Sequence, residues 1–459
     1  MKPNFTAKDF PKIFIVLAVF YAVWGTSGTH FIAGAVMLLL SEAVFLLTFF
    51  KKTSPLEDAE IPTLSLETIK NPFFIPSVIL ILMGVIQILN PAYMVYLKDS
   101  VTYIKKLEHI KFLPSGISGD CELGVSLKSV AELFTGALFA VSIWMYRRDG
   151  RFMGFLLRFF AANCALMAVL AVAQLKSGAN MVYWTFPSGA SFYGTFYYVN
   201  SACAFLFLGF AAASASAVLD FCGKLKYIKL FAWILCGAAI LCAIYFSSSV
   251  GAKMSAVLFA GFAIAIALFA VLRRFCGAKI AAAALAIAIF AAIPAAVYGL
   301  NRGFESLPKT KQDSLAGRFK MYEFSKYVFM KAPILGSGAD SYQYIVQSHP
   351  NYKNSAFSGK NLNSPHNELI AFACEYGVVG AGAVVGAFIL WGIAVFKSRR
   401  VLGFATALIA GGVAVSVIHS RFDLFYHEPS VMIALCLMMA LAAAPMRKFL
   451  GEGRGFGLK

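Results

Sequence analysis

Charged residues are scarce in this sequence of 459 residues. Only 14% are Asp, Glu, Lys or Arg, whereas 60% are hydrophobic and the mean hydropathy is +0.75. Apolar runs repeatedly reach the roughly 20 residues that a helix needs to cross the core of a bilayer. The composition therefore predicts an all-α polytopic membrane protein. A net charge of +18 would suggest nucleic acid as the ligand of a soluble protein, but here we expect no nucleic-acid partner and use the charge to assign loops.

Motifs of metal-dependent and ATP-driven chemistry are absent. The nine cysteines show no Cys-x-x-Cys spacing, and only Cys121 lies in a long polar stretch, which argues against a metal site and a disulfide framework. No Gly-x-x-x-x-Gly-Lys-Ser/Thr loop is present, so the sequence lacks the phosphate-binding motif expected of an ATP-driven pump. There is no His-Glu-x-x-His motif and no outward paired-carboxylate motif. We expect no metal and no other cofactor.

Hydrophobic runs predict about twelve transmembrane helices. The first could pass for a signal peptide, but no clear cleavage site follows it, and we interpret it as an uncleaved span. Basic clusters such as Arg147-Arg148 and Arg273-Arg274 then fall on one side, so the positive-inside rule places them and both termini in the cytoplasm. The predicted spans are residues 13–28, 30–50, 72–97, 129–146, 152–175, 195–219, 230–249, 252–272, 279–298, 366–396, 401–420 and 430–446.

Four polar segments are predicted on the outward side: residues 98–128, 176–194, 299–364, and HSRFDLFYHEPS from His419. The third carries nine Lys/Arg against four acids, a balance of +5 that suggests an anionic ligand outside. The alternative is a loop that is merely well solvated. The chain thus divides into four parts, which are nine spans in 1–298, the large loop 299–364, three spans in 365–446 and a basic tail 447–459.

One stretch of the large loop predicts a surface helix. LAGRFKMYEFSKYVFMKAPILGSGADSY has apolar residues at roughly helical spacing among lysines, and Pro333, Gly336 and Gly338 follow. Such a helix would lie on the outer surface of the membrane.

The tenth span begins with SPHNELIAFACEYGVVG. Ser364 as N-cap and Pro365 at the first helical position would place His366 in the first turn, where the helix dipole favours a neutral histidine that can accept a proton. Small residues including Gly377 and Gly380 share its face, so another helix could approach closely and His366 should point into the bundle. Glu375 falls on the opposite face and needs a partner of its own.

This segment resembles the signature of the O-antigen ligase and O-antigen polymerase superfamily. In that signature His is followed by Asn, Ser or Gln and, nine residues later, by Gly-x-x-Gly; the positions here are His366, Asn367, Gly377 and Gly380. The upstream stretch is similar to the family's passage of an arginine, a helix and Pro-x-x-Gly-x-Gly, with Arg318 in the arginine position.

Two further features enter this comparison. The stretch GTFYYVNSACAFLFLGFA from Gly194 and the layout of twelve spans with one large external loop before the tenth are similar to the family. Between the seventh and eighth spans, however, the family often has Ser-Arg, whereas this chain has SSSVGAK. Lys253 is the nearest cation, and it lacks the two-pronged guanidinium of arginine.

The resemblance implies a GT-C-like helical bundle in the bacterial inner membrane, among membrane lipids, with a large periplasmic loop. Members of the family move a glycan, without a metal, from undecaprenyl diphosphate to an acceptor hydroxyl at the periplasmic face. Arg318 and a second cation would stabilise the leaving diphosphate, and His366 would be the general base. Asn367 would orient the imidazole or a sugar hydroxyl, or simply begin the helix. Other candidate substrate contacts are Lys253, Arg302 and Lys320.

Several alternatives stay open. The acceptor could be lipid A core (a ligase of lipopolysaccharide biosynthesis), a growing glycan (a polymerase) or a protein side chain (an O-oligosaccharyltransferase), and the His-Asn motif favours the ligase. A transporter or flippase of lipid-linked oligosaccharides would also need many spans and buried cations. Against a transporter, the two halves show no convincing repeat, and the polar residues concentrate outside rather than at the midplane.

Outward acids offer a second possibility for the base. Asp423 and Glu428 are the best placed, but with Arg421, His419 and His427 nearby we interpret them as an interfacial ion-pair cluster. If His366 is not the base, Asp340 and Asp423 are the next candidates.

Overall fold

The computed structural model describes residues 10–26, 31–49, 66–98, 101–119, 125–187, 191–221, 226–277, 279, 309–352, 362, 364–397, 403–421 and 427–444. Within these residues, six helices are long and apolar enough to cross a membrane, and five shorter apolar helices accompany them. They correspond to eleven of the predicted spans, and the chain is a multi-pass membrane protein. The remaining span, 279–298, lies outside the described residues except for Lys279.

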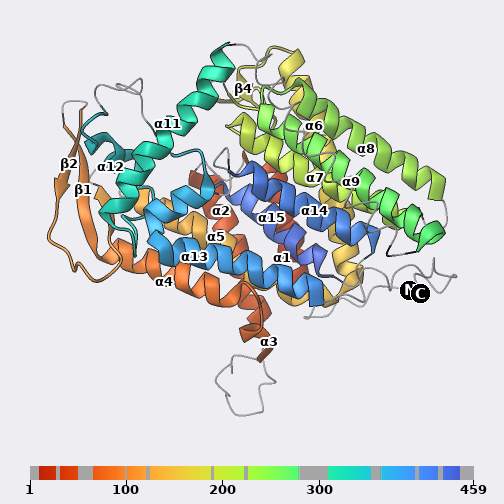
Figure 1. Ribbon diagram of the computed structural model, residues 1–459, viewed down its shortest axis with the longest axis horizontal. Coiled ribbons are helices and arrows are strands. Elements are labelled where there is room, and N and C mark those ends of the chain that lie inside the picture. The colour runs from red at the N-terminus through yellow and green to blue at the C-terminus, as the bar shows by residue number, and fades with distance from the viewer. Residues whose placement is uncertain are drawn as a thin grey trace.

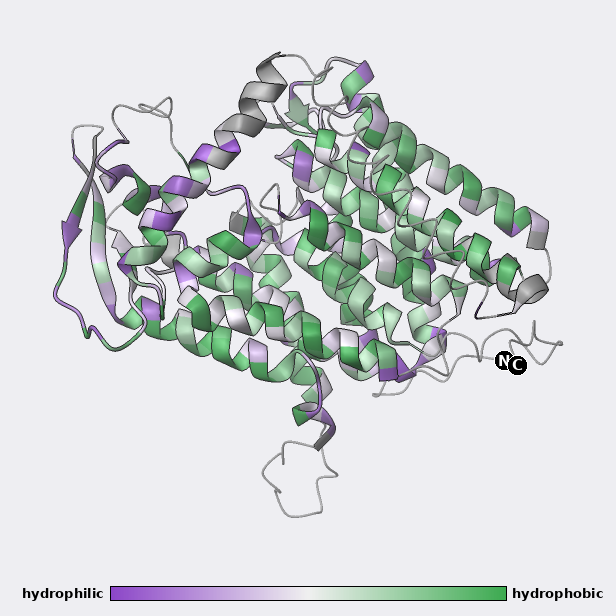
Figure 2. Ribbon diagram, viewed as in Figure 1, coloured by the Kyte–Doolittle hydropathy of each residue, from purple (hydrophilic) through white to green (hydrophobic). Residues whose placement is uncertain are grey.

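Hydrophobic residues predominate in the long helices, whereas hydrophilic residues gather in β2 and in α11 (Figure 2). The apolar helices are α1 (Phe10–Trp24), α2 (Phe31–Phe49), α4 (Phe74–Leu89), α5 (Val125–Met145), α6 (Gly150–Lys176), α7 (Val199–Asp220), α8 (Lys226–Phe246), α9 (Val250–Cys276), α13 (Glu368–Lys397), α14 (Phe404–His419) and α15 (Pro429–Ala442). The polar helix α11 (Lys309–Lys331) and the short α3 (Leu66–Ile69) and α12 (Tyr342–Ile345) complete the helices considered below.

A small sheet replaces the end of the predicted third span. That prediction was wrong, because α4 ends at Leu89 and Asn90 caps it, after which PAYMVYLK continues as a strand. Pro91 cannot continue a helix, and the β-branched and aromatic residues that follow favour a strand. The sheet has the order β2-β1-β3, with β1 (Pro91–Lys98) antiparallel to β2 (Val101–Lys106) and parallel to β3 (Gly116–Gly119).

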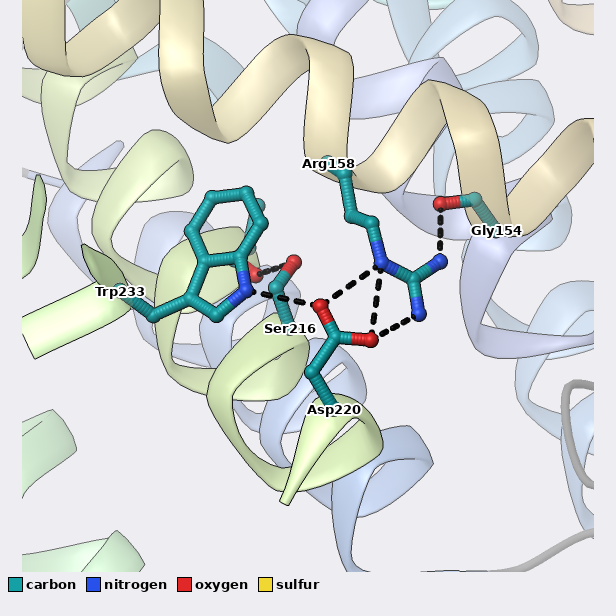
Figure 3. A network of polar contacts seen from close by, with 6 residues as sticks. Gly154, Arg158, Ser216, Asp220 and Trp233 are labelled. Atoms are coloured by element: carbon teal, nitrogen blue, oxygen red, sulfur yellow. Dashed lines mark hydrogen bonds and ion pairs between the residues drawn. The ribbon is translucent and has the colours of Figure 1, made fainter. Parts of the chain in front are cut away.

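The buried helix α7 lies at the centre of the bundle and contacts α6, α8 and α14. A polar network holds its last turn (Figure 3). Arg158 of α6 donates to both carboxylate oxygens of Asp220, with Nε 3.0 and 3.2 Å away, and Trp233 of α8 donates to Asp220 Oδ2 at 2.9 Å. Because an ion pair near a bilayer is costly unless its partners satisfy it, this network joins three helices at one specific position.

Connections between the helices gather at two opposite ends. At one end, Lys12 pairs with Asp149 at 2.8 Å and Arg148 pairs with Glu67. The sheet, α11 and α12 lie together at the other end, beyond the ends of α4 and α13, which run side by side (Figure 1). This second end holds described parts of all four segments that the sequence predicts to face outward, and we call it the loop end.

We predict that the loop end faces the outside of the membrane. In a variant without native cysteines, Lys105→Cys on the exposed part of β2 should react with a membrane-impermeant maleimide added outside. Arg148→Cys, whose side chain is 68% exposed at the opposite end, should react only after the membrane is opened. The reverse pattern of labelling would overturn the topology.

Candidate functional site

Helix α13 is interrupted inside the apolar region. Gly377 has φ 65° and ψ −167°, so the helical hydrogen-bond ladder breaks there. The segment 333–338, which follows α11, docks against the break. Its main chain supplies the partners, with bonds from Val378 N to Pro333 O (2.9 Å), Val379 N to Ile334 O (3.3 Å), Ser337 N to Cys374 O (3.0 Å) and Gly338 N to Glu375 O (2.9 Å). A break at membrane depth is tolerated only when its backbone groups are satisfied in this way.

Glycine is required on both sides of this joint. A Cβ on Gly336 (φ 78°) would lie 2.2 Å from Glu375 O, and a Cβ on Gly377 would lie 2.2 Å from Ile334 O. The buried Gln87 of α4 completes the joint, because its amide donates to Glu375 O at 2.9 Å and accepts from Ala339 N at 3.1 Å. The Pro-x-x-Gly-x-Gly and Gly-x-x-Gly motifs are therefore two halves of one structure.

The expected role of the two α13 glycines is corrected in part. At Gly377 the close neighbour is the segment 333–338 and not another helix. At Gly380 the tight neighbour is Tyr376 of the same helix, 2.1 Å from an added Cβ, whereas Leu80 of α4 would lie at an ordinary contact distance of 3.6 Å.

His366 lies before α13 and not in its first turn, so this prediction was wrong. The helix begins at Glu368, and Asn367 is its N-cap, with Oδ1 accepting from Ile370 N at 3.2 Å. His366 has φ 49°, a left-handed conformation that is uncommon outside glycine. Both Ser364 and Asn367 are good N-cap residues, and Asn367 is favoured by a second bond from its Nδ2 to Arg421 O (3.1 Å). The argument from the helix dipole therefore does not apply to His366.

The end of α14 joins the elements that carry the predicted site residues. We call residues His419, Ser420 and Arg421 the α14 junction. Arg421 O accepts from Tyr322 of α11 at 2.9 Å as well as from Asn367, and Ser420 O accepts from Glu368 N at 3.1 Å. Arg318 lies one turn before Tyr322 on α11. The junction thus holds the turn of Arg318 next to the start of α13.

Helix α9 reaches the same junction. Ser249 caps it, with Oγ accepting from Ala252 N at 3.3 Å, and Lys253 lies in its first turn with Nζ 5.7 Å from the centre of the Tyr245 ring. Gly251 packs against the buried His419, whose Nε2 would lie 2.4 Å from an added Cβ. The structure therefore brings the elements that carry Lys253, Arg318 and His366 to one junction.

Of the other two predicted contacts, only Lys320 lies within the described residues, and it is not brought to this site. Lys320 is exposed, and at two residues from Arg318 it points from a different face of α11. Arg302 lies outside the described residues, as does Asp423.

An acidic network with one histidine lies beside the junction, and sequence reasoning missed it. His427 Nδ1 is 2.9 Å from Glu368 Oε2, and its Nε2 is 3.7 Å from Glu375 Oε2. The expectation of an ion-pair cluster around His427 was right in kind, but the described partners are acids of α13. Glu375 thus has the partner that its position required. Only the i, i+7 spacing of the two glutamates, which puts them on one face of a helix, could have indicated this.

Asp340 and Glu132 lie close enough to this network to interact with it electrostatically. Burial, and the charges of Glu375 and Glu132, raise the pKa of the Asp340 carboxyl to about 7, although His427 opposes the shift. Asp340 has φ 56° and accepts from Gln343 Nε2 at 2.8 Å. Among the described residues, no three His, Cys, Asp or Glu side chains are arranged to hold a metal ion.

The site therefore has two chemical parts. Helices α9 and α11, which carry Lys253 and Arg318, meet the residue after His366 at the junction, and these residue types are suited to stabilising an anion and accepting a proton. The acidic network, with His427 within it, lies on the face of α13 toward α5.

A family model described as O-antigen ligase matches residues 234–385. The match begins within α8 and ends within α13, so it includes α9, α11, the segment 333–338 and both motifs of the joint. A comparison with curated proteins gives no match.

We predict that Gly377→Ala disrupts the joint. The added Cβ would meet Ile334 O, and a left-handed conformation costs a residue other than glycine about 1–3 kcal/mol before any clash. Gly382→Ala is the matched control, because the same helix leaves open space there and alanine favours helices by about 0.5–1 kcal/mol. Thermal unfolding in detergent should separate the two variants. Equal stability would contradict the role of Gly377.

Proposed function

Because the chain belongs to the superfamily of O-antigen ligases and polymerases, we propose that it moves a glycan from undecaprenyl diphosphate to an acceptor hydroxyl at the periplasmic face of the inner membrane. Family membership makes it a ligase-like or polymerase-like membrane glycosyltransferase that uses a lipid-linked glycan and an acceptor. The observation that carries the finer proposal is the α14 junction, which joins the elements of Lys253, Arg318 and His366.

The proposed reaction needs a proton acceptor and positive charge. The acceptor oxygen bonds to the anomeric carbon of the donor sugar, and the bond from that carbon to the diphosphate oxygen breaks. The diphosphate leaves on the lipid with one more negative charge, which Arg318 and Lys253 would stabilise. Lys253 is supported by the N-terminus of α9, which also favours anions. The proton of the acceptor hydroxyl goes to His366.

Within the superfamily we propose an O-antigen ligase without a metal requirement, on the strength of the His366-Asn367 pair. A polymerase and a protein O-oligosaccharyltransferase remain the alternatives. The glycan phenotype of a deletion strain discriminates among them. Polymer retained on the carrier with uncapped lipid A core indicates a ligase, single repeat units on the core indicate a polymerase, and normal lipopolysaccharide with unglycosylated protein indicates the third.

The broken helix α13 is a feature that transporters also have, but its details do not favour transport here. Transporters use broken helices to present backbone groups to a substrate or an ion. In this chain, the backbone oxygens of Cys374 and Glu375 and the amides of Val378 and Val379 bond to the segment 333–338, and Gln87 adds a second bond to Glu375. The break therefore serves to anchor a loop.

We predict that Arg318→Ala abolishes glycan transfer while membrane insertion stays normal. Arg318→Lys should restore transfer only in part, because lysine cannot make two parallel bonds to a phosphate. Lys326→Ala, which removes an exposed cation from the same helix, is the control and should keep near-normal transfer. Transfer can be measured with purified protein and lipid-linked donor. Full activity of Arg318→Ala would remove this residue from the site.

We predict that His366→Ala lowers the transfer rate by about a hundredfold or more, the usual scale of a general base, with donor lipid still bound. Transfer by the unsubstituted protein should also fall toward acid pH, because an imidazolium cannot accept a proton. The test is the rate and pH profile of His366→Gln, which keeps a polar side chain at this corner. A normal rate and profile in that variant would mean that the histidine is only structural.

A further inference from the structure

His427 contacts carboxylates with both ring nitrogens. It lies just before α15, and its partners Glu368 and Glu375 are buried, two turns apart on α13. Phe372, between them on the same face, packs against the imidazole with ring centres 5.3 Å apart. Nδ1 is within hydrogen-bond distance of Glu368 and Nε2 is within ion-pair distance of Glu375, and both carboxylates favour an imidazole that carries a proton on each nitrogen and is positively charged.

The surroundings favour this charged form. Glu368, Glu375 and the phenol of Tyr376 belong to α13, Glu132 with Lys128 at 3.8 Å belongs to α5, and Asp340 belongs to the segment after α11. Burial alone would lower the pKa of His427, but Glu368 and Glu375 outweigh it and hold this pKa well above its ordinary value.

Described residues at both ends of the connection between α14 and α15 bond to the start of α13. Ser420 O accepts from Glu368 N, Arg421 O accepts from Asn367 Nδ2, and the imidazole of His427 contacts the Glu368 carboxylate. We call Asn367 and Glu368 the corner of α13, and His366 directly precedes it. Tyr322, one turn after Arg318, donates to the same carbonyl of Arg421. Movement of the corner would therefore displace the proposed base relative to the proposed diphosphate contact.

We propose that His427 is a positioning residue for glycan transfer, whose imidazolium, held between Glu368 and Glu375, fixes the corner of α13 that presents His366. The proposal rests on the proposed function, because it assigns His427 a role in the same reaction. His427 itself touches neither donor nor acceptor and acts through Glu368.

This role has a definite pH dependence. We call the contacts of the His427 imidazolium with Glu368 and Glu375 the clamp. The pKa of His427 is raised in the folded protein, so the clamp is complete below the ordinary histidine value of about 6.5 and is lost as pH rises through the raised pKa. Transfer should then fall on the alkaline side because of His427 and on the acid side because of His366. We call these two decreases of the transfer rate the acid limb and the alkaline limb. They belong to different residues, so a substitution of one residue should remove one limb and leave the other.

The experiment measures transfer against pH for His427→Gln and His427→Arg. His427→Gln should lower kcat by about 10–100-fold, the scale of a small misplacement, with little change in the KM for donor lipid, and should lose the alkaline limb. His427→Arg should recover part of kcat without an alkaline limb, because guanidinium stays charged. His109→Gln is the control, since His109 lies at the loop end and bonds to Leu107 O of its own loop. An alkaline limb retained in His427→Gln would overturn the proposal.

Amide hydrogen exchange tests the clamp without transfer. In His427→Gln, the amides of residues 368–372 should exchange roughly tenfold faster or more, the scale of one hydrogen bond to a charged group. Glu375→Gln leaves the 2.9 Å contact between His427 and Glu368 intact, so it should increase the exchange rate by less. This second variant keeps the test valid if the His427 variant does not fold. Unchanged exchange in His427→Gln would overturn the clamp. Absence of transfer by the unsubstituted protein would instead refute the proposed function and leave the exchange result standing.

Discussion

A helix interrupted within a bilayer must find partners for the backbone groups that the interruption frees, and the loop end of this protein is built on that constraint. The break at Gly377 takes its partners from the segment 333–338 and from Gln87. That segment directly follows α11 and leads to Asp340, while α13 begins beside His366. Satisfying the break therefore also fixes the end of the polar helix relative to the start of the spanning one. Two motifs that lie about forty residues apart in the sequence are one joint in the fold.

The α14 junction fixes the start of α13 relative to α11. Its contacts are made by the main-chain oxygens of Ser420 and Arg421 with Tyr322 and Asn367, and these residues are uncharged or contribute only backbone atoms. These main-chain and neutral contacts hold α11 and α13 at the junction, where Gly251 of α9 also packs against His419, and α9, α11 and the residue before Asn367 carry the groups to which we assign the chemistry.

Hydropathy predicted the apolar helices well, because each of them is long enough to dominate a window of the sequence. The same averaging hid the strand after Asn90, since PAYMVYLK holds only one charged residue and extends the apolar run of the helix before it, and it hid the break at Gly377, since one residue does not alter the period. The start of α13 was misplaced because Ser364 and Asn367 obey the same capping rule, and a tertiary bond to Arg421 decides between them. The partners of His427 lie on a distant element, so apart from the i, i+7 spacing of the two glutamates no local pattern could indicate them.

The charges at the loop end must be kept apart for the proposed chemistry to work. A carboxylate that reached Arg318 or Lys253 would compete with the diphosphate for its cation. The imidazolium of His427 neutralises part of the charge of Glu368 and Glu375. Burial and neighbouring acids raise the pKa of Asp340 to about 7, so this carboxyl group is partly protonated near neutral pH. His427 and the raised pKa of Asp340 therefore both reduce the negative charge beside the elements that carry the proposed diphosphate contacts.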